Sequence, residues 1–230
     1  MADTESQIDG QSKKPVIVPF KRCEEIYIDD LGNVRTSKFY AFLKRTTDII
    51  FSVVALIILA LPMVIISLVI KSTSKGSVFY RQDRLGLNGK SFAIIKFRTM
   101  DMDAEKDGFK WSDGDDDPRI TKAGRFLRKS RLDELPQFWC ILKGEMSIIG
   151  PRPERACFYN EFEEYIHGFS QRLKVKPGLT GLAQVKGGYY LKPEEKIVYD
   201  IDYIKNRSIG LDFKILVDTI KVIAKGEGAK

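Results

Sequence analysis

The chain has 230 residues with 38 Lys or Arg against 31 Asp or Glu, and its formal net charge is +7. This length suits one sizeable domain with an appendage. Three scattered cysteines and a single histidine exclude a disulfide framework and a His-based zinc site, and the positive charge, without any recognisable nucleic-acid-binding module, suits anionic lipid or a phosphorylated substrate rather than nucleic acid.

The composition divides the chain into three parts. Residues 1–37 are polar and begin like a disordered segment, so they are predicted to form an N-terminal extension of unknown role. Residues 38–75 contain a long apolar run and are predicted to form a membrane element in contact with the lipid bilayer. The remaining residues, 76–230, have the size of an ordinary single domain and are predicted to form the catalytic part.

The run between Asp48 and Lys71 comprises 22 residues without a charge. A helix of that length reaches about 33 Å, the thickness of a bilayer's hydrocarbon core. Pro62 lies past its middle, and a proline ring removes a backbone donor and clashes with the carbonyl four residues back. Both flanks are rich in Lys and Arg, which favours the cytoplasmic side for both ends. Two interpretations remain open: a re-entrant helix broken at Leu61–Pro62, and one span that tolerates the proline.

The domain that follows is predicted to be α+β and mainly helical. Two extended pieces, 77–82 and 91–100, flank Asn88–Gly89, which is a strong signal for a β-hairpin. Short helices are predicted in TKAGRFLRKS, in PQFWCILKG and over roughly 154–169. Two longer helices are predicted near the C-terminus.

The last of these helices carries one apolar stripe. Its residues recur at helical spacing and therefore share a face. They are Phe213, Leu216, Val217, Ile220, Ile223 and Ala224. The stripe suits either core contact or a helix that lies flat on a membrane. Asp212 and Asp218 suit an anionic lipid surface poorly, so core contact is favoured.

The adjacent carboxylates Asp133 and Glu134, in KSRLDELPQF, are the candidate catalytic residues. They directly precede a helix start that is marked by Pro136. A purely structural interpretation also fits, because Ser130 and Asp133 form a capping-box pattern and acids are favoured in the first turn of a helix.

Cationic side chains lie near this pair in the sequence. Arg125 and Arg131 are just upstream, Arg98 ends the second hairpin strand, and Arg152 lies in a rigid Pro-Arg-Pro turn that would hold its planar fork for a phosphate. A carboxylate that attacks an anionic phosphate needs cations, such as Mg²⁺ held by one or two carboxylates and the substrate phosphates. The constellation predicts phosphoryl transfer; a basic, lipid-facing surface is the alternative for the arginines.

From about Phe39 to Ala229 the chain resembles the bacterial sugar transferases known as monotopic phosphoglycosyl transferases. The resemblance rests on several long motifs in the order of that family. They are KRTTDIIFS, VFYRQDRLGLNGKSFAIIKFRTM, DPRITKAGRFLRKSRLDELPQFWCILKGEMSIIGPRPE, KPGLTGLAQVKG and LDFKILVDTIKVIAKGEGA. Leu61 departs from the family, which often has serine before the breaking proline.

The resemblance implies a specific reaction. Such enzymes move a sugar 1-phosphate from a UDP-sugar to undecaprenyl phosphate, release UMP and use Mg²⁺, at the cytoplasmic face of the bacterial inner membrane. The product starts a surface glycan such as a capsule or exopolysaccharide. By the match, Asp133 would be the nucleophile that forms a phosphosugar-aspartyl intermediate and, with Glu134, a metal ligand. Arg152, in the Pro-Arg-Pro match, would hold substrate phosphate, and Arg98, Arg131 and Arg125, other cations of the constellation around the pair, are further candidate phosphate ligands.

The resemblance also implies a membrane topology. It implies a re-entrant helix broken near Pro62, interfacial helices in the catalytic domain, and a minimal form without the four additional N-terminal spans of some members. Two other function classes remain open. A membrane-bound scaffold or regulator would bind anionic lipid without turnover, and a multi-span phosphotransferase fits poorly with one hydrophobic segment. The sequence leaves open the sugar, the glycan pathway and whether the protein is a homodimer.

Overall fold

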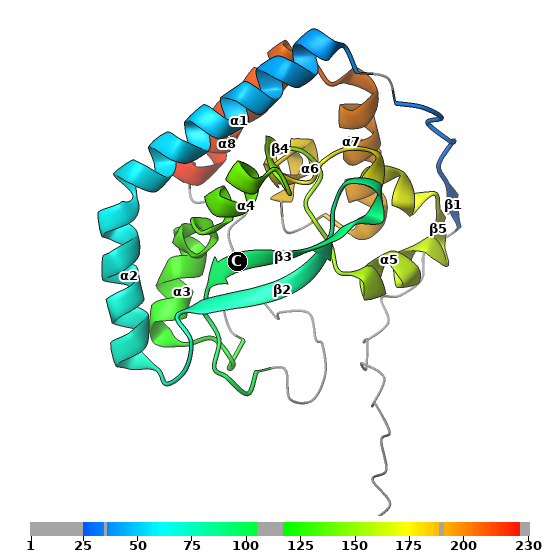
Figure 1. Ribbon diagram of the computed structural model, residues 1–230. Helices are drawn as coiled ribbons and strands as arrows, with labels where there is room; N and C mark the ends of the chain where they lie inside the picture. Colours follow the sequence, from blue (N-terminus) through cyan, green and yellow to red (C-terminus); the bar gives the residue numbers. More distant parts are fainter. Residues whose placement is uncertain (1–24, 35, 105–116, 189–190, 226–230) are drawn as a thin grey trace, which may run out of the picture.

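The computed structural model describes residues 25–34, 36–104, 117–188 and 191–225 (Figure 1). Helices predominate and the strands are short, so the predicted mainly helical α+β class is confirmed. Residues 1–24 and 35 of the predicted N-terminal extension lie outside the described residues. In chain order the elements are β1 (Ile26–Tyr27), α1 (Lys38–Ile58), α2 (Ala60–Thr73), β2 (Phe79–Leu85), the 3₁₀ turn η1 (Leu87–Gly89), β3 (Ser91–Phe97), α3 (Lys122–Lys129), the 3₁₀ turn η3 (Leu132–Glu134), α4 (Gln137–Lys143), β4 (Ser147–Ile149), α5 (Ala156–Glu163), β5 (Ile166–His167), the 3₁₀ helix η4 (Phe169–Lys174), β6 (Gly178–Thr180), α6 (Leu182–Lys186), α7 (Pro193–Asn206) and α8 (Ile209–Lys225).

The charge-free run forms the second half of α1 and most of α2, and the two helices are bent by 59° at a break at Leu59. The break lies before Pro62 rather than at it, because the proline ring clashes with the carbonyl of Ile58 and its nitrogen donates no hydrogen bond. Within the described residues no single helix is long and apolar enough to cross a membrane, whereas the bent pair taken together has the length and composition to do so. In Figure 1 the pair runs along one side of the molecule, in blue and cyan.

The side of α1 that faces the protein is polar. Its buried residues are Tyr40, Asp48 and Ser52, whereas Ile50, Ile57 and most of its other apolar side chains are exposed. A helix on the surface of a soluble domain shows the reverse arrangement. An outward apolar face of this extent is typical of a surface that contacts lipid or another protein.

Strands β2 and β3 form an antiparallel hairpin in which Tyr80 lies opposite Lys96. Its turn contains Asn88 and Gly89, whose φ angles of 55° and 73° lie in the left-handed region that these two residue types adopt most readily. Because side chains alternate along a strand, Tyr80, Arg84 and Lys96 share one face of the hairpin.

The short helices follow the local signals only in part. α4 begins directly after Pro136 and ends before Gly144, whose φ of 88° satisfies the left-handed C-terminal cap. The helix predicted over roughly 154–169 is too long, since α5 ends at Glu163. Ile166–His167 instead pair in parallel with β1, near the start of the chain. Such a long-range partner is not visible in the local pattern.

Strand β4 pairs in parallel with β6, and both contribute to the main hydrophobic core. Gly150, the residue after β4, packs closely against the segment just before β6. A Cβ atom on Gly150 would lie 2.4 Å from the carbonyl oxygen of Lys176. Its N–H donates to the Thr180 carbonyl, and the N–H of Gly178 donates to the Pro151 carbonyl, each at 2.9 Å. These contacts hold the backbone of the Pro-Arg-Pro turn.

Helix α8 divides its apolar side chains between two surroundings. Ile215 is buried, and the half-buried Leu216 packs against the core. Phe213, Ile220 and Ile223 are more than half exposed. The predicted core contact is therefore wrong for these three residues, because the face that α8 buries is centred on Ile215, to one side of the stripe.

Candidate active site

A cavity of about 550 Å³ lies along one face of the hairpin and continues over η3, the Pro-Arg-Pro turn and α7. Its volume is in the range of small-molecule sites. Cations outnumber acids among its lining side chains, and they include Arg84, Lys96, Arg128, Arg131, Arg152 and Lys196. A cavity with this charge suits an anionic ligand.

Asp133 and Glu134 lie in η3, the turn between α3 and α4, and both line the cavity. Arg131, directly before the turn, has a φ of 56°, a left-handed conformation that costs a non-glycine residue about 1 kcal/mol or more. The hydroxyl of Ser130 donates to the carbonyl of Phe126, and η3 has no side-chain cap. The capping-box interpretation of this segment is therefore wrong.

Glu134 is held by two cations. Its Oε1 accepts a hydrogen bond from Lys96 Nζ at 2.6 Å and one from Arg152 Nη2 at 2.5 Å. Burial raises the pKa of this carboxyl, but the charges of Arg152 and Lys96 outweigh burial and hold the pKa well below its ordinary value. Glu134 is therefore ionised at neutral pH and joins the hairpin to the Pro-Arg-Pro turn.

Asp133 is 8% exposed, and its carboxyl makes no hydrogen bond within the part of the chain that the structure describes. Burial raises the pKa of Asp133 to about 6, although Lys96 opposes this shift. A carboxylate without hydrogen bonds in such surroundings is costly to keep. A strongly shifted acid in a cavity is suited to react with a ligand or to bind a cation.

Asp133→Asn should stabilise the protein at neutral pH. An unfolded Asp has a pKa of about 3.9, so the raised value in the folded state disfavours folding once the group ionises. This penalty is absent below about pH 4, grows as the pH rises towards about 6, and then amounts to about 2–3 kcal/mol. We expect the variant to unfold several degrees higher than the wild type at about pH 7.5 and at the same temperature near pH 4. Asp83→Asn, on an exposed hairpin position, is the matched control and should show no such difference.

The backbone of Arg152 is fixed from behind the cavity. Arg172 donates from Nη2 to the Arg152 carbonyl at 2.8 Å and from Nε to Asp200 at 2.7 Å. The side chains of Arg172 and Asp200 are each 2% exposed, and the guanidinium lies 4.8 Å from the ring centroid of Phe169. A buried ion pair thus holds the turn that presents Arg152 to Glu134.

The other predicted phosphate ligands lie in different surroundings. Arg131 lines the cavity. Arg98 lines it as well, but its guanidinium donates to the carbonyl of Lys75 at 2.5 Å and to both oxygens of Ser74, at the end of α2. Arg125 is exposed on α3 and is not part of the cavity wall. The positions favour Arg152 and Arg131 over Arg98 and Arg125 as phosphate ligands.

A family model described as bacterial sugar transferase matches residues 39–226. The chain belongs to the bacterial sugar transferase family. It is 40% identical over 212 residues to a UDP-N-acetylgalactosamine-undecaprenyl-phosphate N-acetylgalactosaminephosphotransferase of Aeromonas hydrophila, in an alignment that covers 91% of this chain and 50% of the relative.

Two further relatives carry names of the same kind. A UDP-glucose:undecaprenyl-phosphate glucose-1-phosphate transferase of Klebsiella pneumoniae is 43% identical over 182 residues, 77% of this chain and 39% of the relative. An undecaprenyl-phosphate galactose phosphotransferase of Salmonella typhimurium is 37% identical over 223 residues, 89% of this chain and 45% of the relative. The chain thus spans about half the length of these relatives, or less.

The carboxylate pair of this bacterial sugar transferase fits the predicted Mg²⁺ as a partial ligand set. Among the described residues no three His, Cys, Asp or Glu side chains converge as a metal cluster. Mg²⁺, however, is commonly bound by one or two carboxylates and takes its other ligands from water and substrate phosphates. Both hydrogen bonds of Glu134 go to Oε1, so Oε2 and the Asp133 carboxylate have no hydrogen-bond partner among the described residues and remain available as ligands for such an ion.

Three further cationic side chains of the cavity were not predicted as ligands from the sequence. Lys96 binds Glu134, and Arg84 and Lys196 line the cavity. Strand alternation could have identified Arg84 and Lys96, because the hairpin register places both on the cavity face. No local signal marks Lys196, whose position depends on how α7 packs.

Proposed function

We propose that this bacterial sugar transferase transfers a sugar 1-phosphate from a UDP-sugar to undecaprenyl phosphate and releases UMP. The observation that carries the proposal is the Asp133 carboxylate, nearly buried in a cationic cavity beside Glu134, which two cations already bind. The relatives that the chain matches are named for transfers of this class. The product would begin a surface glycan such as a capsule or exopolysaccharide.

The transfer runs as two displacements on one phosphorus atom. A carboxylate oxygen of Asp133 attacks the sugar-bearing phosphorus of the UDP-sugar, an aspartyl-phosphate bond forms, and the bridging P–O bond breaks, so that UMP leaves with the electron pair. A phosphate oxygen of undecaprenyl phosphate then attacks the same phosphorus, and the bond to Asp133 breaks. The carboxylate is regenerated, and a sugar-diphosphate lipid is released.

The cations around the pair lower the barrier to the first attack. A carboxylate repels a diphosphate, and Arg152, Arg131 and Lys96 are positioned to offset that repulsion. A pKa of about 6 leaves Asp133 mostly ionised at neutral pH and still basic enough to be nucleophilic. Asp133 and Glu134 would hold Mg²⁺, and the bound ion would supply further positive charge beside the phosphate oxygens.

Helices α1 and α2 are proposed to enter the bilayer and to leave it by the same, cytoplasmic face. Contacts at the two ends of the pair support this topology. On α1, Arg45 donates to the carbonyls of Ile141 and Leu142 at the end of α4, each at 2.7 Å. At the end of α2, Arg98 binds Ser74. Because one folded domain binds both ends, a span with its ends on opposite sides does not fit.

UMP release by purified protein in nanodiscs tests the proposal. The assay contains undecaprenyl phosphate, Mg²⁺ and, one at a time, the UDP derivatives of N-acetylgalactosamine, glucose and galactose, which are the sugars in the names of the relatives. We expect release with one donor, repeated turnover only with undecaprenyl phosphate present, and loss of release with EDTA. Folded protein that releases no UMP from any donor would indicate a lipid-binding scaffold instead.

A further inference from the structure

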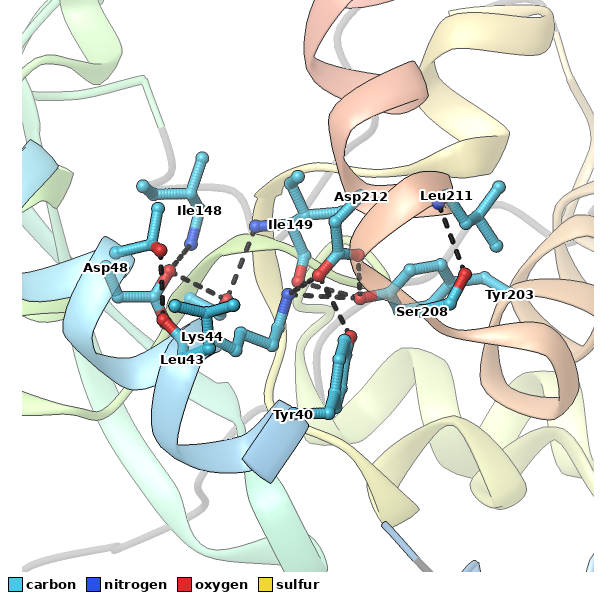
Figure 2. A network of polar contacts seen from close by, with 12 residues as sticks. Tyr40, Leu43, Lys44, Asp48, Ile148, Ile149, Tyr203, Ser208, Leu211 and Asp212 are labelled. Carbon is cyan, nitrogen blue, oxygen red and sulfur yellow. Dashed lines mark hydrogen bonds and ion pairs between the residues drawn. The ribbon is translucent and has the colours of Figure 1, made fainter. Parts of the chain in front are cut away.

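Helices α1, α7 and α8 meet in a polar network beside strand β4 (Figure 2). Its centre is Asp212 on α8. Oδ2 of Asp212 accepts hydrogen bonds from Tyr40 and Lys44 of α1, and Oδ1 accepts one from Tyr203 of α7, each at 2.9 Å. These four side chains form the Asp212 network, which lies outside the catalytic cavity.

Tyr203 connects the Asp212 network to the strand. It is 2% exposed, and its hydroxyl lies 3.3 Å from the carbonyl oxygen of Ile149, the last residue of β4. Burial raises the pKa of Tyr203, so the hydroxyl keeps its proton and remains a donor. Lys44 donates to the same hydroxyl oxygen at 3.2 Å, so the single phenol proton is shared between Asp212 and the Ile149 carbonyl.

Helix α1 also binds the strand directly. Oδ1 of the buried Asp48 accepts a hydrogen bond from the Ser147 hydroxyl at 3.1 Å and one from the Ile148 N–H at 2.9 Å. Ser147 and Ile148 are therefore tied to α1 through Asp48. Ile149 is tied to α1 through Tyr203 and Lys44 (Figure 2).

The strand leads straight to the active site. Only Gly150 and Pro151 separate it from Arg152. The N–H of Gly150 is hydrogen-bonded to β6, and the ring of Pro151 fixes the φ angle of Pro151. This two-residue connection is therefore short and rigid. It joins Ile149 to Arg152, whose guanidinium lies 2.5 Å from Glu134.

We infer that the Asp212 network is a positioning device for Arg152, through which the placement of the apolar helix α1 and of α8 sets the geometry of the catalytic cavity. The inference rests on the proposed function, because it requires Arg152 to act on the transferred phosphate. Tyr203 is the positioning residue, since it acts through Ile149 and touches no reacting atom. Without its hydroxyl, the Ile149 carbonyl loses this donor, and the turn is left with its other contacts, such as those with β6 and Arg172.

Tyr203→Phe, made alone and together with Arg152→Lys, tests the inference in nanodiscs at saturating undecaprenyl phosphate. We expect kcat/KM for the UDP-sugar to fall about tenfold in the wild-type background, as for the loss of one buried hydrogen bond. The loss should be less than about twofold when residue 152 is already lysine, because residues that act through one another are not additive. Tyr199→Phe, one turn earlier on α7 and outside the network, is the matched control and should change neither value.

The inference would be overturned if Tyr203→Phe lowered kcat/KM equally with and without Arg152→Lys, or if Tyr199→Phe lowered it as much. Tyr203 would then only stabilise the fold in general. Hydrogen exchange in the peptide covering residues 147–152 is a second readout that needs no turnover. We expect faster exchange there in Tyr203→Phe than in Tyr199→Phe, and equal exchange would count against the device. A wild-type protein without turnover would refute the proposed function. The hydrogen-exchange comparison would still test whether the Tyr203 hydroxyl stabilises the turn.

Discussion

Asp133→Asn should lower UMP release by at least about three orders of magnitude while the protein stays folded. The amide has nearly the shape of the carboxylate but lacks the nucleophilic oxygen that we propose forms the aspartyl-phosphate bond. The neighbouring carboxylate is a poor replacement, because Lys96 and Arg152 both bind Glu134 and lower its pKa. Steady-state UMP release with the preferred UDP-sugar, compared at equal amounts of folded protein, measures the effect.

A trapping experiment separates the nucleophile from a supporting residue. With a UDP-sugar labelled in the sugar, and without undecaprenyl phosphate, label should accumulate on the wild-type protein and remain after denaturation. Asp133→Asn should accumulate none, whereas Asp83→Asn, exposed on the hairpin, should behave like the wild type. Turnover near the wild-type level in Asp133→Asn would show that another group is the nucleophile, even if the reaction class is right.

The largest loss of stability is expected from breaking the buried pair of Arg172 and Asp200. Removing one partner leaves the other charge buried, which costs about 3–5 kcal/mol. Arg172→Met should therefore lower the midpoint of thermal unfolding in detergent by about 10 °C. It should also lower turnover, because the Arg152 carbonyl loses its donor.

A second substitution distinguishes the unpaired charge from lost packing. Adding Asp200→Leu to Arg172→Met should restore much of the stability, since a buried ion pair can be replaced by apolar side chains at little net cost. Turnover should stay low, because the donor to Arg152 is still missing. A double variant as unstable as the single one would mean that contacts such as the one with Phe169 are what stabilise the fold.

Local sequence patterns determined several features of this protein. The charge-free run 49–70 with Pro62 specifies an apolar helix pair with a break, because helix length and proline geometry are properties of consecutive residues. Asn88–Gly89 specifies the hairpin turn, and Pro136 and Gly144 bound α4 for the same reason.

The sequence predicted the carboxylates of the candidate site but not which cations bind Glu134. The motif around Asp133 and Glu134 marks the carboxylates, but a motif does not tell which cation binds which acid. Lys96, 38 positions from Glu134, is its partner, whereas Arg98, directly after the end of the same strand, binds the end of α2. The two cations are only two positions apart in the chain, and which group each one binds depends on the element that packs beside it, which proximity in the chain did not predict.

Only the tertiary structure decided how the apolar helix α1 is tied to α8, α7 and β4, and so to the Pro-Arg-Pro turn. Tyr40 and Asp212 are 172 positions apart and nonetheless share a hydrogen bond. The exposed Phe213 and the buried Ile215 differ by two positions on one helix. Helix periodicity predicts which residues share a face, but which face is buried, and which polar group finds a partner there, depends on the elements that pack against it.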